Sequence, residues 1–234
     1  MNIGKIVKSD SHINYVCQIY GPNDREEKPG PADYAFGRFV RVALRSTLYE
    51  DGSSAHNEKD PVTYAVGVIY DTILQNPAFG SLGPRLSNET QVELFSPDYI
   101  SEKAILTYVM MLGMIEQRND GQGDAIEYLA ATHGVPLLSL ELDGEIETMN
   151  DKDVRAFHFF NDSTNPGDVS RPYSTDSYLH IGYLPHIISQ RNSLLPMVTL
   201  CIIDQLEHLF PQNLALLSIV KRNFAWRLKV ETAG

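Results

Sequence analysis

Hydrophobic and polar positions alternate in several short segments of the first third of the chain. In one of them Val40 and Val42 share one face and Arg41 falls on the other, the pattern of an antiparallel strand with one dry and one wet face. Several segments also carry a glycine, which lets a sheet coil sharply or another backbone approach. The pattern predicts a small, closed or nearly closed β-barrel over residues 1–95, with strands at 3–8, 15–20, 36–44, 62–70 and 91–95.

The hydrophobic period changes near residue 96. Ser96-Pro97-Asp98 has the residue types of a helix start, with a serine cap, a proline in the first turn and an acidic side chain after it. Apolar residues then recur at helical spacing as far as Asn119. The stretch 138–142 alternates before Asp143-Gly144, which is typical either of a hairpin or of a loop packed on helices.

The rest of the chain has mainly helical patterns. We expect one helix over 150–160 with Asn150 as its cap, and one over 175–190 with a kink or restart at Pro185. Two more are predicted over 193–210, with Ser193 as cap and Pro211 as the end, and over 214–228. The predicted fold is therefore α+β, with an N-terminal barrel over 1–95 and a mainly α-helical domain over 96–234.

The composition limits the partners and the compartment. The 234 residues include 19 basic and 30 acidic side chains, and the net charge of −11 repels nucleic acid and anionic membranes. Cys17 and Cys201 lie far apart and form no zinc-binding group, which is typical of reduced thiols. Lys5 and Lys8 interrupt any signal-peptide core, and no apolar run is long enough to span a bilayer. We expect a cytoplasmic protein that binds no membrane and, on its own, no nucleic acid.

Sequence motifs of nucleotide-dependent enzymes and of serine hydrolases are absent. The chain contains no GxxxxGK[ST] phosphate loop, no GxGxxG dinucleotide fingerprint and no GxSxG nucleophile elbow. We therefore expect no ATP hydrolysis by this chain alone, no catalytic residue and no cofactor.

Acidic side chains occur at spacings that a divalent ion could use. Such residues are more often the solvated edge of a helix or a polar surface, and we assign no metal ligand among them. The groups concerned are Asp204 with Glu207 and His208, Asp151 with Asp153, and Glu145 with Glu147.

The C-terminal helix carries a basic cluster interleaved with aromatic residues. Basic side chains beside a stacking ring are typical of nucleic-acid contacts, but basic residues near a helix C-terminus also complement the helix dipole, and we favour the second interpretation. The residues concerned are Lys221, Arg222, Phe224, Trp226, Arg227 and Lys229.

Several segments of the chain resemble a known family. IGKIV, FGRFVRVAL and AVGVIYDTILQNP, in this order, resemble the HerA–ATP synthase (HAS) barrel, the small N-terminal β-barrel of HerA-type translocase ATPases and of the rotary ATP synthase α and β subunits. AFGSLGPRL, SPDYI, DVRAFH and CIIDQLEHLFPQN are similar to segments of a stand-alone HAS-barrel family from cyanobacteria, to which no activity is assigned.

The resemblance implies an assembly role. In HAS-barrel ATPases the barrel forms a ring collar that helps the ATPase to form a hexamer or docks a partner, whereas no phosphate loop, Walker B strand or arginine finger follows it here. The chain is thus expected to be a non-enzymatic docking or assembly module that works with a HerA-type P-loop ATPase or as a homo-oligomer. The expected contact residues are Arg38, Arg41, Asn76, Phe79 and Arg85 at the barrel, with Arg222 and Trp226 in the C-terminal helix.

Two functions of other classes stay open. One is a metal-dependent hydrolase or nuclease with an acidic and histidine site in the helical part, which ion binding would stabilise. The other is a nucleic-acid accessory protein that uses the basic and aromatic helix, with binding that weakens as the salt concentration rises.

Overall fold

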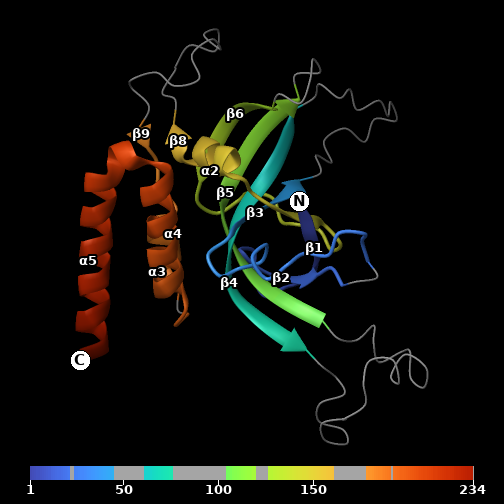
Figure 1. The fold of residues 1–234 in the computed structure, drawn as a ribbon, viewed down its shortest axis with the longest axis horizontal. Coiled ribbons are helices and arrows are strands. Elements are labelled where there is room, and N and C mark those ends of the chain that lie inside the picture. Colours follow the sequence, from blue (N-terminus) through green and yellow to red (C-terminus); the bar gives the residue numbers. More distant parts are fainter. Residues whose placement is uncertain are drawn as a thin grey trace, which may run out of the picture.

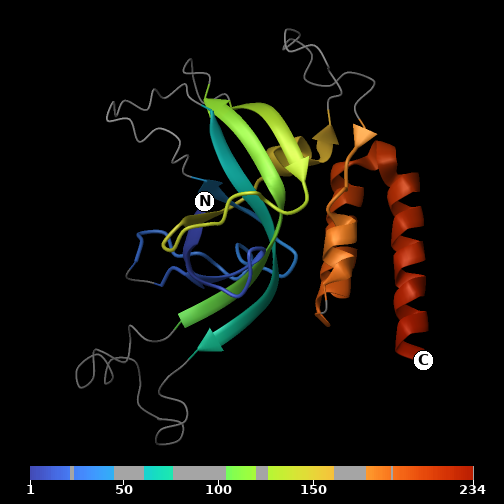
Figure 2. The same ribbon diagram turned by 180° about the vertical axis from the view of Figure 1, so that it is seen from behind.

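The computed structural model describes residues 1–21, 24–44, 61–75, 104–119, 126–160, 178–190 and 192–233. They form an α+β fold in which a seven-stranded antiparallel sheet comes first and helices lie at the C-terminal end, as Figures 1 and 2 show from opposite sides. The predicted α+β class is confirmed at this level. The strands of the sheet are β1 (Asn2–Ser9), β2 (Asn14–Ile19), β3 (Phe39–Leu44), β4 (Val62–Gln75), β5 (Ala104–Asn119), β6 (Ile126–His133) and β7 (Glu145–Thr148).

The described helices follow the last strand of the sheet. A short two-stranded pair separates the first helix from the others, and no helix in the described part of the chain has the length and apolar content needed to cross a membrane. These elements are α2 (Asp151–His158), β8 (Phe159–Phe160), β9 (Tyr178–Leu179), α3 (Leu184–Ser189), α4 (Leu195–Leu209), the 3-10 turn η3 (Pro211–Asn213) and α5 (Leu214–Ala233).

The strand pairings return to the strand from which they start. The order of the sheet is β2-β1-β7-β3-β4-β5-β6, and β2 pairs in addition with β5. On one side β5 pairs with β4, and on the other it pairs with β2 over 106–110 and with β6 over 113–119. The β4–β5 register shifts between Val66 and Gly67 and again between Ile69 and Asp71, and such bulges bend a strand and increase its twist. Six strands are therefore hydrogen-bonded on both edges, and β6 lies beside β5 alone among the described strands.

Alternating strand residues pack into two separate cores. Val40, Val42 and Ile69 belong to a core made by the strands, which we call the strand core. Phe39 and Val68 point the other way, into a core shared with the helices, which we call the interlayer core. The predicted alternation is thus confirmed, but the face expected to be wet is covered by helices. From α2 to α4 the interlayer core includes Phe157, Tyr183, Ile187, Val198, Ile202 and Leu206.

The predicted helix that ends at Asn119 is wrong, because this segment is the long strand β5. Met110, Met111 and Leu112 are consecutive and all buried, so β5 has no polar face from which a period of two could be read. The segment forms a strand because it pairs with β4 along the whole length of β4. The sheet continues as far as β7, beyond residue 95, and the described helices begin with α2. The expected cap at Ser96, the domain boundary there and the strand over 91–95 lie outside the described residues.

The helix predictions nearer the C-terminus are mostly confirmed. Asn150 caps α2 through a capping box: its side chain accepts from the amides of Lys152 and Asp153, and the Asp153 side chain accepts from the Asn150 amide. The helix predicted over 175–190 is confirmed only in its second part: Tyr178–Leu179 is the strand β9, and helix α3 begins at Leu184 with Pro185 in its first turn. Ser193 is not the cap of α4, because the helix begins at Leu195 after Leu194, which makes no side-chain capping bond.

The stretch 138–142 forms a loop and not the arm of a hairpin. The turn residue Asp143 has a φ of 60°, and β7, which follows it, pairs with β1 and β3. The loop packs against the first strands and not against the helices: the Tyr15 hydroxyl accepts from the Leu140 amide at 3.1 Å. Both interpretations made from the sequence are therefore corrected.

Gly37, two residues before β3, joins the sheet to α4. Its φ of +81° lies in the left-handed region, and an added Cβ would lie 2.5 Å from the Cys201 Sγ on α4. The Gln205 side chain also donates to the Gly37 carbonyl at 2.7 Å. We expect Gly37→Ala to lower the free energy of unfolding by about 1–3 kcal/mol in urea titrations, because alanine is strained at this φ.

The Cys201→Ala background separates the two causes. It removes the Sγ, the atom nearest to the added Cβ, but leaves the Cys201 Cβ at 3.2 Å and the backbone strain, so Gly37→Ala should cost less there without becoming neutral. A full recovery would argue against strain, and an unchanged cost would argue against the contact with Cys201.

Candidate functional site

The expected contact residues do not gather in one site. Asn76, Phe79 and Arg85 lie outside the described residues. Arg38 immediately precedes β3 and Arg41 lies within it. Arg222 and Trp226 lie on α5, and this helix is on the far side of α4 from the sheet (Figure 1). Arg38 is partly buried, and its Nε has no hydrogen-bond partner among the described residues.

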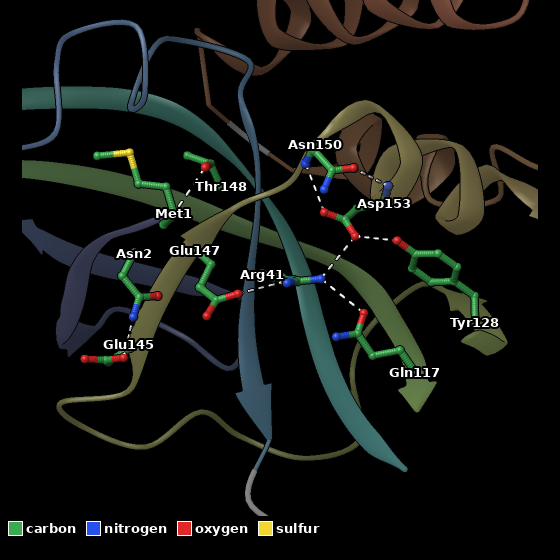
Figure 3. A network of polar contacts seen from close by, with 10 residues as sticks. All are labelled: Met1, Asn2, Arg41, Gln117, Tyr128, Glu145, Glu147, Thr148, Asn150 and Asp153. Carbon is green, nitrogen blue, oxygen red and sulfur yellow. Dashed lines mark hydrogen bonds and ion pairs between the residues drawn. The ribbon is translucent and has the colours of Figure 1, made fainter. Parts of the chain in front are cut away.

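Arg41 is engaged in a network inside the fold (Figure 3). Its Nε donates to Glu147 on β7 at 2.9 Å, and its Nη1 donates to Gln117 on β5 at 3.1 Å and to Asp153 on α2 at 3.2 Å. The guanidinium carbon lies 4.7 Å from the centre of the Tyr64 ring. Burial by itself lowers the pKa of Arg41, but Asp153 and Glu147 outweigh it and hold this pKa above its ordinary value. Arg41 is therefore a permanent charge that joins four elements.

Asp153 is the buried acidic partner of this network. Its side chain is only 2% exposed, and besides Arg41 it accepts from the Tyr128 hydroxyl at 2.6 Å and from the Asn150 amide at 3.0 Å. A carboxylate with these donors is paired and hydrogen-bonded, as a buried charge must be. The solvated surface expected for Asp151 and Asp153 is thus correct only for the exposed Asp151. The capping box at Asn150 is the sequence signal that points to Asp153.

A second polar cluster lies between the sheet and the helices and consists of three histidines and a tyrosine. His158 at the end of α2 is fully buried; its Nδ1 donates to the Val154 carbonyl and its Nε2 accepts from the Tyr183 hydroxyl, both at 2.7 Å. His133 at the end of β6 stacks on His180 with the ring centres 4.2 Å apart. No spacing pattern in the sequence unites these residues, because they come from separate elements.

Burial favours the uncharged forms of His158, His133 and Tyr183. It lowers the pKa of His158 to about 3 and that of His133 to about 4, and it raises the pKa of Tyr183 well above the ordinary value. His133 uses both nitrogens, because Nε2 donates to the Phe157 carbonyl at 2.8 Å and Nδ1 accepts from the Gly182 amide at 3.0 Å. Both nitrogens of His158 are engaged in the same way, so these two imidazoles hold elements together and present no lone pair to a substrate or a metal.

The acidic side chains of α4 that were weighed as metal ligands are paired with a lysine. The Lys221 ammonium lies 2.8 Å from Glu207 and also forms an ion pair with Asp204. Hydrogen bonds first with Asp204 and then with Glu207 raise the pKa of Lys221. The His208 ring is bonded to the carbonyl of Asp204, at 2.7 Å. Within the described ranges, no three His, Cys, Asp or Glu side chains come together in a way that could hold a metal ion.

Helix α5 is apolar on two opposite faces. Leu217 is fully buried in the interlayer core, as the predicted stripe requires, but Leu214 of the same stripe is exposed. On the other side Ile219 is 58% exposed and Trp226 is 68% exposed. We call this second surface the outer helix face, and it consists of Leu216, Ile219, Arg222 and Trp226, all exposed.

A second exposed apolar surface lies on the loop between β6 and β7. Leu137 at its centre is 86% exposed. The loop is anchored beneath this surface, since His12 bonds the Pro136 carbonyl at 2.6 Å through Nε2 and the Ser139 hydroxyl at 3.0 Å through Nδ1. We call the surface the acidic loop, and it consists of Val135, Leu137, Leu138, Glu141 and Leu142, all exposed.

One small pocket lies between the ends of α3, α4 and α5. Its volume is about 160 Å³, and most of its lining is apolar, including Ile187, Leu195, Phe224 and Leu228. Ligand pockets usually measure about 300–1,000 Å³ and combine apolar walls with a few aimed polar groups. The pocket therefore gives no argument for a small-molecule site.

The comparison with family models matches almost the whole chain. A model described as a domain of unknown function (DUF8166) matches residues 1–233. The chain belongs to this family. The match spans the described sheet and helices together. No curated protein matches the chain.

Proposed function

We propose that this member of the DUF8166 family is a non-enzymatic assembly module that docks a protein partner. The observation that carries the proposal is the contrast between the interior and the surface. The buried polar groups of the Arg41 network and of the histidine cluster are bonded to one another, while large apolar side chains are exposed on the outer helix face and the acidic loop. Clustered apolar surface of this kind marks interaction sites.

The proposed partner is a P-loop ATPase of the HerA type. The segments IGKIV, FGRFVRVAL and AVGVIYDTILQNP support it through their resemblance to the HAS barrel. The cycle of pairings through six strands supports a barrel-like sheet. The contact surface would include the barrel residues Arg38, Asn76, Phe79 and Arg85, with Arg41 holding β3 in place from within.

An affinity purification of the tagged full-length protein from its native cells tests this proposal. We expect a P-loop ATPase to be recovered in stoichiometric amount, and we expect the purified chain alone to hydrolyse no ATP above the buffer rate. ATP hydrolysis that follows the protein through successive purification steps would overturn the non-enzymatic role. The absence of any ATPase from the purified complex would overturn the proposed partner.

A nucleic-acid accessory role is favoured by one observation. Arg222 and Trp226 are one helical turn apart and both exposed, so a base could stack on the indole beside a guanidinium. Binding of a fluorescent single-stranded oligonucleotide that weakens steeply with salt and is lost in Trp226→Ala would support this role. No binding at low salt would exclude it.

A further inference from the structure

The outer helix face and the acidic loop both expose apolar side chains that a monomer would leave in water. Single exposed apolar residues are ordinary, but each of these surfaces gathers at least three of them. Helix α5 carries the clearer signal, because Leu217 is buried on one face while Ile219 and Trp226 are exposed on the other. A helix that is apolar on opposite faces is normally covered on both.

The two surfaces carry opposite charge. On helix α5 Lys221 is paired with Asp204 and Glu207 of α4, and the basic side chain that the outer helix face exposes is Arg222. Of the three acidic residues in the stretch 135–145, Asp143 is paired with Lys5 and Glu145 with Arg25, so the exposed Glu141 is the one whose charge no ion pair among the described residues balances. Complementary charge steers and orients association, and like charges facing one another oppose it. Pairing of α5 with a second α5 would bring together two faces that each expose Arg222, whereas the acidic loop offers apolar contacts with the opposite charge.

The position of the two surfaces excludes their contact within one chain. The acidic loop is held to β1 and β2 by His12, Tyr15 and the Lys5–Asp143 ion pair. Both views show the loop, in yellow, beside β1 and β2, and α5 beyond α4 on the opposite side of the protein (Figures 1 and 2). An acidic loop that docks on the outer helix face must therefore come from another copy of the chain.

We infer that copies of this chain associate head to tail, with the acidic loop of one copy docked on the outer helix face of the next. Leu137 and Leu142 pack beside Ile219 and Trp226, and Glu141 faces Arg222. The contact joins two different surfaces, so every copy keeps one surface of each kind for a further neighbour, and the assembly closes into a ring or grows as a filament. This inference rests on the proposed assembly role and names the contact that performs it.

Sedimentation of the full-length chain over a series of concentrations tests the contact. We expect the wild type to form assemblies larger than a dimer, and Trp226→Ser or Leu137→Ser to weaken association about tenfold or more, as loss of a central apolar anchor does. Leu74→Ser is the matched control, because Leu74 is 77% exposed on β4, outside both surfaces, and its replacement should change nothing. A wild type that is monomeric at every concentration would overturn the inference.

Mixing the two variants separates a head-to-tail contact from a symmetric one. Trp226→Ser keeps an intact loop and Leu137→Ser keeps an intact helix face, so together they should form a complex of one copy of each and nothing larger. A symmetric interface through either surface alone gives no such complementation, and a mixture that stays monomeric would contradict the inference. The charge pair is tested in parallel: Arg222→Glu and Glu141→Arg should each weaken association, and the double variant should regain it.

These outcomes are distinct from those that test the partner ATPase. A monomeric chain that still purifies with a P-loop ATPase would remove the head-to-tail contact and keep the proposed partner. A chain that assembles as expected but purifies with no ATPase would keep the contact and remove that partner.

Discussion

Asp153→Ala should lower the free energy of unfolding by about 3–5 kcal/mol, because it leaves the buried Arg41 guanidinium without its acidic partner on α2. The Asp153 side chain is 2% exposed and accepts from Arg41, from Tyr128 and from the Asn150 amide, so the substitution also removes one half of the capping box of α2. Urea unfolding of the wild type and the variant, followed by circular dichroism, measures the difference.

The neighbouring acidic residue provides the matched control. Asp151 lies in the same first turn of α2 but is exposed, so Asp151→Ala should cost about 1 kcal/mol or less, the size of a helix-dipole effect. The double variant Arg41→Leu, Asp153→Ala should lose less than the sum of the single variants, because the second change removes the charge that has lost its partner on α2. Equal costs at Asp151 and Asp153, or strict additivity, would contradict a buried network.

Acid should destabilise the protein between pH 6.5 and 4 through the histidine cluster. Burial lowers the pKa of His133 to about 4 and that of His158 to about 3, from an ordinary value of 6.5, so the unfolded chain binds protons more readily than the folded one. The stabilisation from each neutral imidazole is complete above pH 6.5 and is lost as the pH falls toward the folded-state pKa. Between pH 7 and pH 5, each of these two histidines should lower the free energy of unfolding by about 2 kcal/mol.

Urea unfolding at the two pH values, with a variant of each kind, tests this dependence. His133→Gln should be less stable than the wild type at pH 7 but should lose about 2 kcal/mol less between pH 7 and pH 5, because one titrating group is gone. Ile187→Val, a small truncation in the same interlayer core, should cost about 0.5–1.5 kcal/mol at both pH values. If His133→Gln had the same pH dependence of stability as the wild type, the titration of His133 would not be the cause of the acid destabilisation.

The two buried clusters also bear on the proposed assembly role. The Arg41 network joins β3, β5 and β7 to α2, and the histidine cluster joins β6 to α2 and to the segment before α3. Sheet and helices are thereby held to one another by polar bonds as well as by apolar packing. A fixed relation between the sheet side, with the acidic loop, and the helix side, with the outer helix face, is what a head-to-tail assembly of identical copies requires.

The amino-acid sequence by itself determined the strands in which apolar residues alternate and the helix start that has a local capping pattern. In β3 and β4 apolar and polar or small residues alternate with a period of two, and Asn150 with Asp153 marks the start of α2. Each of these signals is complete within a few residues, so it needs no partner to be read.

Only the tertiary structure decided the features that depend on distant residues. β5 is apolar on both faces and could be read with either period, until pairing with β4, β2 and β6 makes it a strand. The local pattern places Arg41 on a solvent-exposed face, whereas in the structure it is bonded to Asp153 of α2, which is more than a hundred positions away in the sequence. The pairing of β2 with β5, the stacking of His133 on His180 and the placing of the acidic loop opposite α5 are likewise absent from any local pattern. They arise because burying apolar surface brings together segments that no short-range periodicity relates.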